Sequence, residues 1–343
     1  MIARAGMIQI RSAMEYRFLG KTGVRISKLV FGTMSFGGDA DEATSAALFG
    51  RCRDAGINFF DCADVYAKGR SEEILGKLVA GCRDEVVIST KAYFPTSADQ
   101  NARGSSRLHL AHAVEASLRR LGTDRVDVFF LHRFDDVTAL EETLHALETL
   151  VRQGKILYPA VSNFSAWQTA KALGVATCAG WAPVVASQPM YNLLKRQAEV
   201  EILPHARAEG LGVLTYSPLA GGLLSGKYGV GKAPERGRLQ ENAMYKTRYG
   251  APSNLEIADA FTALAAELGH HPATLAIAWV AAQPGVTAPL IGARNLEQLE
   301  PCLAAAELAL DAELLSRIGA LSPEPPPATD RNEEKSANNY GSR

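Results

Sequence analysis

The chain has 343 residues, of which 47% are hydrophobic and 21% are charged, a composition typical of a globular protein with ample material for a core. Its formal net charge is -1, so no basic excess argues for a nucleic-acid partner or an anionic membrane surface. No run of about 18 apolar residues occurs, and the sequence therefore predicts no membrane-spanning helix.

The cysteines and the two ends of the chain indicate where the ordered part lies. The 5 cysteines are widely spread without a C-x-x-C pair, which favours reduced thiols in a cytoplasmic protein over disulfides or structural zinc. Residues 1–14 contain no apolar stretch of signal-peptide length, and we expect an N-terminal extension there. Residues 323–343 are proline-rich and then polar, which predicts a loosely ordered tail. No linker divides residues 15–322, so we expect a single domain.

Short apolar runs recur along this part of the chain. Residues 18–29 come first, with turn residues Lys21, Thr22 and Gly23 between two strand-like pieces, and predict a β-hairpin. Near-continuous runs rich in Val, Ile and Phe follow, as in strands that are covered on both faces. We predict strands over residues 29–32, 57–61, 86–91, 127–132, 156–163, 184–188, 211–216 and 288–292.

Helical patterns lie between the predicted strands. Residues 71–81 begin with Ser71, an expected N-cap, and residues 109–122 end in Gly122, a common C-terminal signal. Residues 138–155 carry apolar side chains at spacings of three and four. The alternation predicts an α/β protein, a (β/α)₈ TIM barrel with an N-terminal β-hairpin and extra C-terminal helices. We favour it over an open doubly wound sheet because eight units fit the usual barrel size of about 250 residues plus insertions.

Polar side chains close most of the apolar runs. In a parallel barrel, reactive groups project from the carboxyl ends of the strands, so these residues are expected to share one rim. Each alone could cap a helix or lie in solvent, but so many at one rim indicate a functional site. They are Thr33, Asp61, Lys91, His132, Asn163, Gln188, Tyr216, Ser217 and Arg294.

Several other site types do not fit the sequence. His109-x-x-His112-x-x-Glu115 has ligand spacing, but it lies in a predicted helix remote from the strand ends, so we expect no metal site. No G-x-S-x-G nucleophile elbow occurs. Gly221–Lys227 resembles a P-loop, yet Tyr228 stands where Ser or Thr is needed for magnesium. No G-x-G-x-x-G follows the first strand, so a bound dinucleotide would not be held in the Rossmann manner.

An ordered series of motifs from about Phe18 to about Leu310 resembles the aldo-keto reductases, in particular the bacterial branch near aryl-alcohol dehydrogenases and potassium-channel β subunits. The motifs include FLGKTGVRISKLVFGTMSFGG, NFFDCADVY, STK, SLRRLGTDRVDVFFLHRFD, VSNFS, SQPMYNLL, YSPLAGGLLSGKY and PLIGARNLEQL. The resemblance implies reduction of an aldehyde or ketone by NADPH. It implies a small-molecule carbonyl substrate and leaves a homo-oligomer open.

The family's catalytic Asp, Tyr, Lys and His fall on Asp61, Tyr66, Lys91 and His132. Hydride arriving at a carbonyl leaves an alkoxide that must be protonated, and Tyr66 would be the acid. An unperturbed phenol has a pKa of about 10, so Lys91 is expected to lower the pKa of Tyr66 while Asp61 holds the ammonium. His132 would donate a hydrogen bond to the substrate oxygen.

The resemblance also implies a cofactor site. The nicotinamide carboxamide of the cofactor would meet Ser162, Asn163 and Gln188, since an amide needs both donors and acceptors. The ring of Tyr216 would stack beneath the nicotinamide. The pyrophosphate of the cofactor would lie along residues 217–227, and Arg294 would pair with a 2′-phosphate, which favours NADPH over NADH. Arg236 or Arg238 could assist. The implied positions are Gly32, Thr33, Met34, Asp61, Ser162, Asn163, Gln188, Tyr216, Ser217, Pro218, Leu219, Gly221, Leu223, Gly226, Lys227, Gly292, Arg294 and Gln298.

The sequence departs from the family pattern near the adenine. Close relatives carry Glu–Asn where this chain has Pro301 and Cys302, which puts the adenine contacts in doubt. Ala160 and Cys62 replace other small residues and should leave the chemistry intact. The loops over residues 92–106, 133–137 and 229–253 would set the substrate. Their aromatic residues suggest an apolar opening, although such residues also pack loops: Tyr93, Phe94, Phe134, Tyr245 and Tyr249.

Two other functions stay open. An NADPH-sensing subunit that resembles the channel β proteins would keep the same four residues. A lyase that uses Lys91 as a Schiff-base nucleophile is chemically conceivable, but Asp61 beside it would keep the lysine charged.

Overall fold

A computed structural model describes residues 14–235 and 237–336, so most of the expected N-terminal extension and residues 337–343 of the expected tail lie outside the described residues. The described part begins with the predicted hairpin. Strands β1 (Tyr16–Phe18) and β2 (Arg25–Ser27) pair in antiparallel fashion. Within the turn, the backbone N–H of Thr22 donates to Leu19 O at 3.2 Å. The hairpin prediction is confirmed, whereas the domain boundaries stay predictions.

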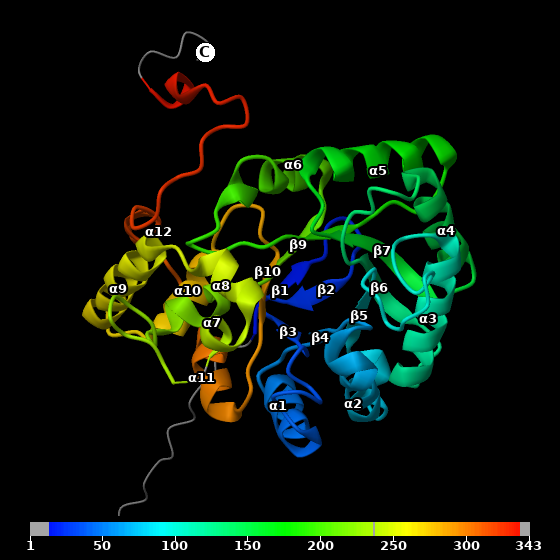
Figure 1. Cartoon of the computed structure of the whole chain (residues 1–343), viewed down its shortest axis with the longest axis horizontal. Coiled ribbons are helices and arrows are strands. Elements are labelled where there is room, and N and C mark those ends of the chain that lie inside the picture. The colour runs from blue at the N-terminus through cyan, green and yellow to red at the C-terminus, as the bar shows by residue number, and fades with distance from the viewer. Residues whose placement is uncertain (1–13, 236, 337–343) are drawn as a thin grey trace, which may run out of the picture.

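Eight parallel strands follow and close into a barrel in the order β10-β3-β4-β5-β6-β7-β8-β9 (Figure 1). Each overlaps one predicted apolar run, with bounds that differ by up to two residues, so the TIM barrel is confirmed and the open sheet is excluded. The strands are β3 (Val30–Gly32), β4 (Phe59–Asp61), β5 (Val87–Ala92), β6 (Val126–Leu131), β7 (Ile156–Ser162), β8 (Ala186–Gln188), β9 (Gly212–Thr215) and β10 (Ala288–Ile291).

Helices surround the barrel. One helix follows each of the barrel strands β3 to β8 in turn: α1 (Glu42–Asp54), α2 (Arg70–Val79), α3 (Arg107–Leu121), α4 (Leu140–Arg152), α5 (Ala166–Ala179) and α6 (Ile202–Glu209). The rest lie on either side of β10: α7 (Arg238–Glu241), α8 (Ala243–Tyr249), α9 (Pro252–Glu267), α10 (Pro272–Ala281), α11 (Leu296–Ala304) and α12 (Ala312–Gly319). Among the described residues, no helix combines the length and the apolar character needed to cross a membrane.

The two predicted helix signals have different outcomes. Gly122 ends α3 in the left-handed conformation, with φ 62°, so that prediction is confirmed. Ser71 is not the N-cap of α2, because the helix begins one residue earlier and Gly69 is its cap. The Ser71 hydroxyl instead donates to Thr33 O at 2.8 Å inside the protein. A hydrogen bond to Thr33, which is distant in the sequence, has thus taken the place of the expected capping bond within α2.

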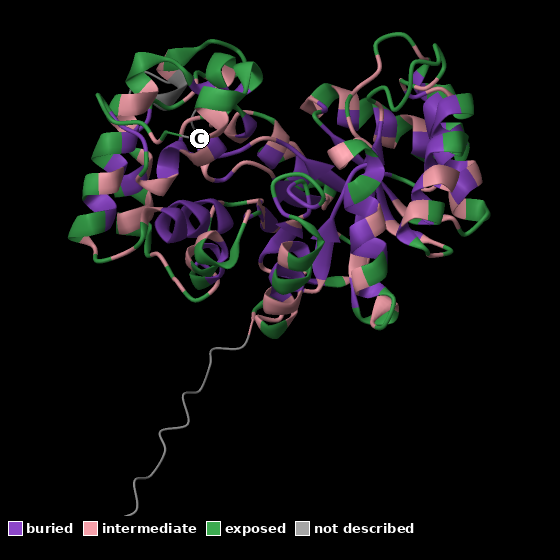
Figure 2. Ribbon diagram, turned by 60° about the horizontal axis from the view of Figure 1, so that its bottom comes forward, coloured by how far each residue is buried: buried purple, intermediate pink, exposed green. Residues whose placement is uncertain are grey.

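Alternation along the strands divides the barrel interior into an apolar and a polar level. Successive side chains of a strand point to opposite faces, so inward positions recur every second residue. The lower inward positions form one buried apolar cluster, and the last inward position of several strands is polar, as with Asp61 above Phe59 and Ser162 above Ala160. Figure 2 shows the buried residues concentrated in these central strands and on the inner sides of the helices.

The hairpin closes the amino end of the barrel. Leu19 and Ile26 are buried in the apolar cluster of the interior. The guanidinium of Arg17 donates to Ala281 O at 3.0 Å and to Thr287 O at 3.1 Å, both of which precede β10. The polar level therefore faces the opposite end, where the carboxyl ends of the strands form the mouth.

Candidate active site

A buried ion pair joins the ends of two neighbouring strands. Lys91 Nζ lies 2.5 Å from Asp61 Oδ2, and the two side chains are 0% and 1% exposed. Lys91 also donates to the backbone O of Cys62 at 2.6 Å. The other carboxylate oxygen of Asp61 accepts from Ser89 Oγ at 2.6 Å and from Gln188 Nε2 at 3.0 Å. Every oxygen of this buried carboxylate is thus hydrogen-bonded, as a buried charge requires.

The charge on Lys91 is stabilised despite its burial. Burial by itself lowers the pKa of a lysine, but the negative charge on the carboxylate of Asp61 outweighs it and raises the pKa of Lys91 above its ordinary value. A lysine that stays protonated is a poor nucleophile, and this geometry argues against a Schiff base on Lys91.

Tyr66 follows β4 and begins a short 3-10 helix, η1 (Tyr66–Gly69). Lys91 Nζ lies 5.1 Å from the centre of its ring. Burial raises the pKa of Tyr66 to about 12, although Lys91 acts to lower it. The expected influence of Lys91 has the predicted sign, but the net direction is the reverse, because burial disfavours a phenolate more than one ammonium favours it. Next to Tyr66, Ala67 and Lys68 have φ 47° and 56°, a strained conformation for residues other than glycine.

His132 follows β6 and faces both Tyr66 and an aromatic loop residue. Its ring stands edge-on to Tyr66, with centroids 6.1 Å apart, and to Phe94, with centroids 4.9 Å apart. The backbone O of His132 accepts from Asn163 Nδ2 at 3.0 Å. Nδ1 is buried and has no hydrogen-bond partner within the described chain. An imidazole in such surroundings is held neutral, and burial followed by the charge on Lys91 lowers the pKa of His132 to about 3.

We therefore expect His132 to stay neutral throughout the neutral pH range. Its ring ¹⁵N shifts, assigned with His132→Gln, should remain those of neutral imidazole as the pH falls from about 7 to about 4, whereas a free histidine titrates near 6.5. In the same interval the unfolded chain takes up a proton that the folded chain does not, so this residue makes folding less favourable as the pH falls. The urea-unfolded protein is the control, and a folded-state titration near pH 6 would contradict the assignment.

A further buried carboxyl, that of Asp64, stands between Asp61 and Tyr66 in the sequence, and the sequence analysis did not identify it. Asp64 is 3% exposed, and neither of its side-chain oxygens has a protein partner within residues 14–235 and 237–336. Burial, followed by the nearby carboxylate of Glu72, raises the pKa of Asp64 to about 7. Glu72 itself is paired with Arg120 at 2.6 Å. Only the position of Asp64 inside an otherwise apolar stretch could have drawn attention to it.

Amides and hydroxyls complete the mouth on the side of β7, β8 and β9. Asn163 has φ 57°, is exposed, and donates from Nδ2 to Ser162 Oγ at 3.0 Å. The Tyr216 hydroxyl donates to Asn163 Oδ1 at 2.7 Å. Gln188 is 3% exposed, and its Oε1 accepts no hydrogen bond from the described residues, while its Nε2 is held by Asp61. The four residues that the sequence grouped here are brought together.

The segment after β9 is tightly curled. It contains a 3-10 helix, η4 (Ala220–Ser225), and its positive φ angles occur at Ser217, Ala220, Gly221, Gly222 and Gly226. Among the expected cofactor positions of this segment, Pro218 and Leu223 are buried, Ser217, Leu219 and Gly226 are partly exposed, and Lys227 is exposed. A side chain at Gly221 would place its Cβ 2.7 Å from the ring of Tyr245. Such winding lets backbone N–H groups approach an anion.

The expected cofactor positions after β3 do not all face the mouth. Gly32 ends β3, and Met34 is 42% exposed although it is apolar. The side chain of Thr33 is fully buried, its hydroxyl donates to Asp61 O at 3.1 Å, and Ser71 Oγ, which donates to Thr33 O, lies 2.9 Å from the same hydroxyl. The hydroxyl of Thr33 thus supports the strand ends from outside the mouth.

The positions after β10 lie at the start of α11. Gly292 is exposed, and the backbone N–H of Arg294 donates to Gln298 Oε1 at 3.2 Å. Of the two departures from the family pattern, Pro301 lies within the span of α11 and is partly exposed, whereas Cys302 is 2% exposed. Arg238 begins α7, with its guanidinium 5.3 Å from the ring of Tyr245, and Arg236 lies outside the described residues.

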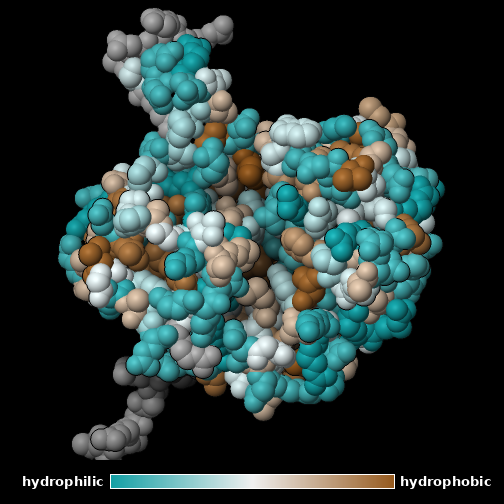
Figure 3. All heavy atoms as spheres, viewed as in Figure 1, coloured by the Kyte–Doolittle hydropathy of each residue, from teal (hydrophilic) through white to brown (hydrophobic). Residues whose placement is uncertain are grey.

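The aromatic residues of the loops divide into two groups. Phe94 is 37% exposed beside His132, and Phe134 packs on Trp167, which is 61% exposed. Tyr245 and Tyr249 stack on each other and are buried, so they pack the long loop after β9. Figure 3 shows the face over which α7 and α8 lie, with a hollow beside them near the middle of the view.

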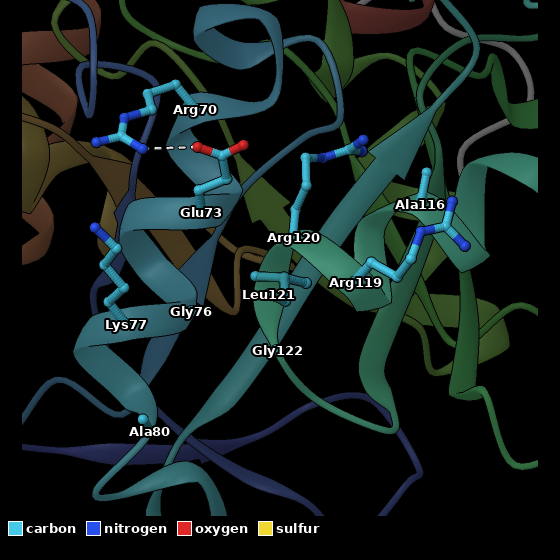
Figure 4. A pocket seen from close by; sticks show the side chains of 10 residues that line it. All are labelled: Arg70, Glu73, Gly76, Lys77, Ala80, Ala116, Arg119, Arg120, Leu121 and Gly122. Atoms are coloured by element: carbon cyan, nitrogen blue, oxygen red, sulfur yellow. Dashed lines mark hydrogen bonds and ion pairs between the residues drawn. The ribbon is translucent and has the colours of Figure 1, made fainter.

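A separate groove of about 550 Å³ lies between α2 and α3 on the outside of the barrel (Figure 4). Its basic side chains do not converge on one point. Arg70 pairs with Glu42 and Glu73, and Lys77 pairs with Glu42. In α3, Glu115 of the His-x-x-His-x-x-Glu pattern pairs with Lys155. In the part of the chain that the structure describes, no three His, Cys, Asp or Glu side chains are grouped to hold a metal ion.

Comparison with known proteins gives consistent matches along most of the chain. The model of the aldo/keto reductase family matches residues 28–323. The chain is 41% identical over 323 residues to a Bacillus subtilis (strain 168) protein named uncharacterized oxidoreductase YrpG, covering 91% of this chain and 97% of that protein. It is 37% identical over 326 residues to a probable voltage-gated potassium channel subunit beta of Oryza sativa subsp. japonica, with 92% and 99% covered. A protein of the same name from Arabidopsis thaliana is 37% identical over 302 residues, with 86% and 92% covered.

Proposed function

Because this chain belongs to the aldo/keto reductase family, we propose that it reduces an aldehyde or ketone to the alcohol with NADPH and that Tyr66 donates the proton. The observation that carries the proposal is the buried Lys91–Asp61 ion pair, which lies against Tyr66 at the mouth of the barrel. A buried charge pair is costly to maintain, and its place at the mouth supports a catalytic role over a purely structural one.

The chain's own residues account for the proton. Tyr66 keeps its proton at neutral pH, since the pKa of a phenol is well above 7 and burial raises it further, so the acid form is present when a carbonyl arrives. As negative charge develops on the substrate oxygen, the proton moves from the Tyr66 hydroxyl to that oxygen, and the ammonium of Lys91 stabilises the phenolate that remains. Asp61 fixes Lys91 in place. Neutral His132 donates a hydrogen bond that orients the substrate oxygen.

The donor set at the mouth fits a nicotinamide cofactor, which when bound supplies the hydride. Gln188 Oε1 is an acceptor without a described protein donor. The exposed Asn163 Oδ1 accepts from Tyr216 and can accept one more hydrogen bond, whereas both N–H donors of Asn163 are already used within the protein. With Ser162 and Tyr216 these residues would hold the carboxamide and the ring. The curled backbone from Ser217 to Lys227 would hold the pyrophosphate.

NADPH is preferred over NADH in this proposal because of Arg294. Its guanidinium is 30% exposed at the start of α11 and can pair with a 2′-phosphate, with Gly292 and Gln298 beside it. Phe94, which is 37% exposed, leaves apolar surface beside His132, which suits a small carbonyl compound. The five cysteines form no disulfide, and free thiols persist in the reducing cytoplasm, so we expect the protein to work there.

The test is consumption of NADPH, followed by the ultraviolet absorbance of the reduced nicotinamide, with a panel of aromatic and aliphatic aldehydes. We expect turnover that depends on both enzyme and aldehyde, and formation of the matching alcohol by chromatography. Enzyme that neither binds NADPH nor consumes it with any member of the panel would contradict the proposal.

A second candidate is an NADPH-sensing subunit, and two plant relatives are named probable voltage-gated potassium channel subunit beta. Such a subunit would keep Asp61, Tyr66, Lys91 and His132 but would bind NADPH without rapid turnover. Tight NADPH binding measured by calorimetry, together with no alcohol product from the whole panel, would favour this candidate over the reductase.

A further inference from the structure

The guanidinium of Arg294 already has an anionic partner in the protein. Arg294 Nε lies 3.0 Å from Asp39 Oδ2, and the side chains are 30% and 50% exposed. Asp39 belongs to the loop between β3 and α1, while Arg294 lies between β10 and α11. Figure 1 shows α1 and α11 side by side, so the pair bridges segments from opposite ends of the chain.

The loop that carries Asp39 is held in place by its own hydrogen bonds. Gly37 N donates to Ala40 O at 2.8 Å, and Ala40 N donates to Ser35 O at 2.9 Å. The buried hydroxyl of Ser35 donates to Ala293 O at 2.8 Å, the residue directly before Arg294. The backbone segments that carry the two partners are therefore joined to each other, which keeps the carboxylate of Asp39 within reach of the guanidinium.

We propose that Asp39 sets the cofactor specificity of this protein by competing with the 2′-phosphate of NADPH for Arg294. The inference rests on the proposed function, in which Arg294 receives that phosphate. A phosphate monoester carries about -1.5 to -2 charges at neutral pH, so it must either displace the carboxylate of Asp39 or bind beside it against repulsion. NADH has a 2′-hydroxyl and meets neither obstacle. Asp39 thus weakens the binding of NADPH but not that of NADH, and brings the affinities for the two cofactors closer together.

The test is a calorimetric titration of the full chain and of Asp39→Asn with NADPH and, separately, with NADH. Because the pair is partly exposed, we expect the Kd for NADPH to fall by about three- to tenfold in Asp39→Asn, and the Kd for NADH to change by less than about twofold. The gain should shrink at high salt, since added ions screen the repulsion that the substitution removes.

Glu300→Gln is the matched control. Glu300, in α11, is also a carboxylate paired with an arginine: its Oε1 lies 2.7 Å from Nε of Arg51 in α1. It makes no ion pair with Arg294. The control removes the same charge from the same region and should leave both Kd values unchanged. Thermal unfolding of both variants, followed by circular dichroism, verifies that they are folded.

The outcomes separate this inference from the proposed function. If the wild-type chain binds NADPH but Asp39→Asn leaves its Kd unchanged, or tightens NADH equally, the inference is overturned and the reductase stands. An equal gain in Glu300→Gln would overturn it too, because it would show a general effect of net charge. If the wild type binds neither cofactor, both proposals fail.

Discussion

Replacing Tyr66 by Phe is expected to lower kcat for aldehyde reduction by about 10²- to 10⁴-fold, the usual contribution of a positioned acid. The substitution removes only the hydroxyl. Its ring can still pack beside His132, whose centroid lies 6.1 Å away, and still face Lys91 Nζ at 5.1 Å. Affinity for NADPH should therefore stay within about twofold, because no new cavity or unpaired charge is created. Stopped-flow measurement of a single turnover, with NADPH binding measured separately, checks both statements.

A matched control for this substitution is Tyr93→Phe. Tyr93 lies in the neighbouring loop and packs edge-on to Phe94, with centroids 5.3 Å apart, so the variant removes a hydroxyl from the same aromatic surroundings. We expect its kcat to remain within about threefold of the wild type, as for a side chain that does not supply the proton. Equal losses in both variants, or an unchanged kcat in Tyr66→Phe, would show that Tyr66 is not the acid.

Replacing Lys91 by Met is expected to abolish turnover and to lower the free energy of unfolding by about 3–5 kcal/mol, since it leaves a buried carboxylate without its partner. Asp61 would keep its bonds from Ser89 and Gln188, but neither donor carries a charge. Urea unfolding, followed by circular dichroism, measures the loss. The control Lys77→Met breaks an ion pair of exposed side chains and should cost less than about 1 kcal/mol.

A double variant distinguishes the two roles of the pair. Asp61→Asn with Lys91→Met removes both charges, so the unfolding free energy should recover most of what the single variant lost, while turnover should remain absent. A single variant as stable as the wild type would contradict the picture of a buried charge pair. Recovered turnover in the double variant would show that the ammonium has no part in the reaction.

The arrangement of the strands could be predicted because it depends on local patterns. Residues 86–91 were expected as a strand and form β5 over Val87–Ala92, since an unbroken apolar run suits a strand covered on both faces. The period of two then places Asp61 and Lys91 on the inner face of adjacent strands. Their contact follows from sequence pattern and the closure of the barrel together.

What could not be predicted depends on contacts between distant segments. Ser71 looks like a helix cap in sequence, but its hydroxyl finds Thr33 in the folded chain. The raised pKa of Tyr66 reflects the sum of burial and neighbouring charges, which no motif encodes. Asp39 and Arg294 meet only because β10 closes the barrel against β3. These two contacts and this pKa depend on which distant segments lie close together in the folded chain, and no local sequence pattern specifies that.

The hairpin under the barrel has a practical consequence for handling the protein. Because β1 and β2 seal the amino end of the barrel, Met14, two residues before β1, lies at the face opposite the mouth. A linker fused there would tether the molecule to a bead or an electrode with its opening turned toward the solution. Attachment through Cys178, exposed at the end of α5, would instead come from the flank of the barrel. The amino-terminal route is thus the natural one for immobilisation.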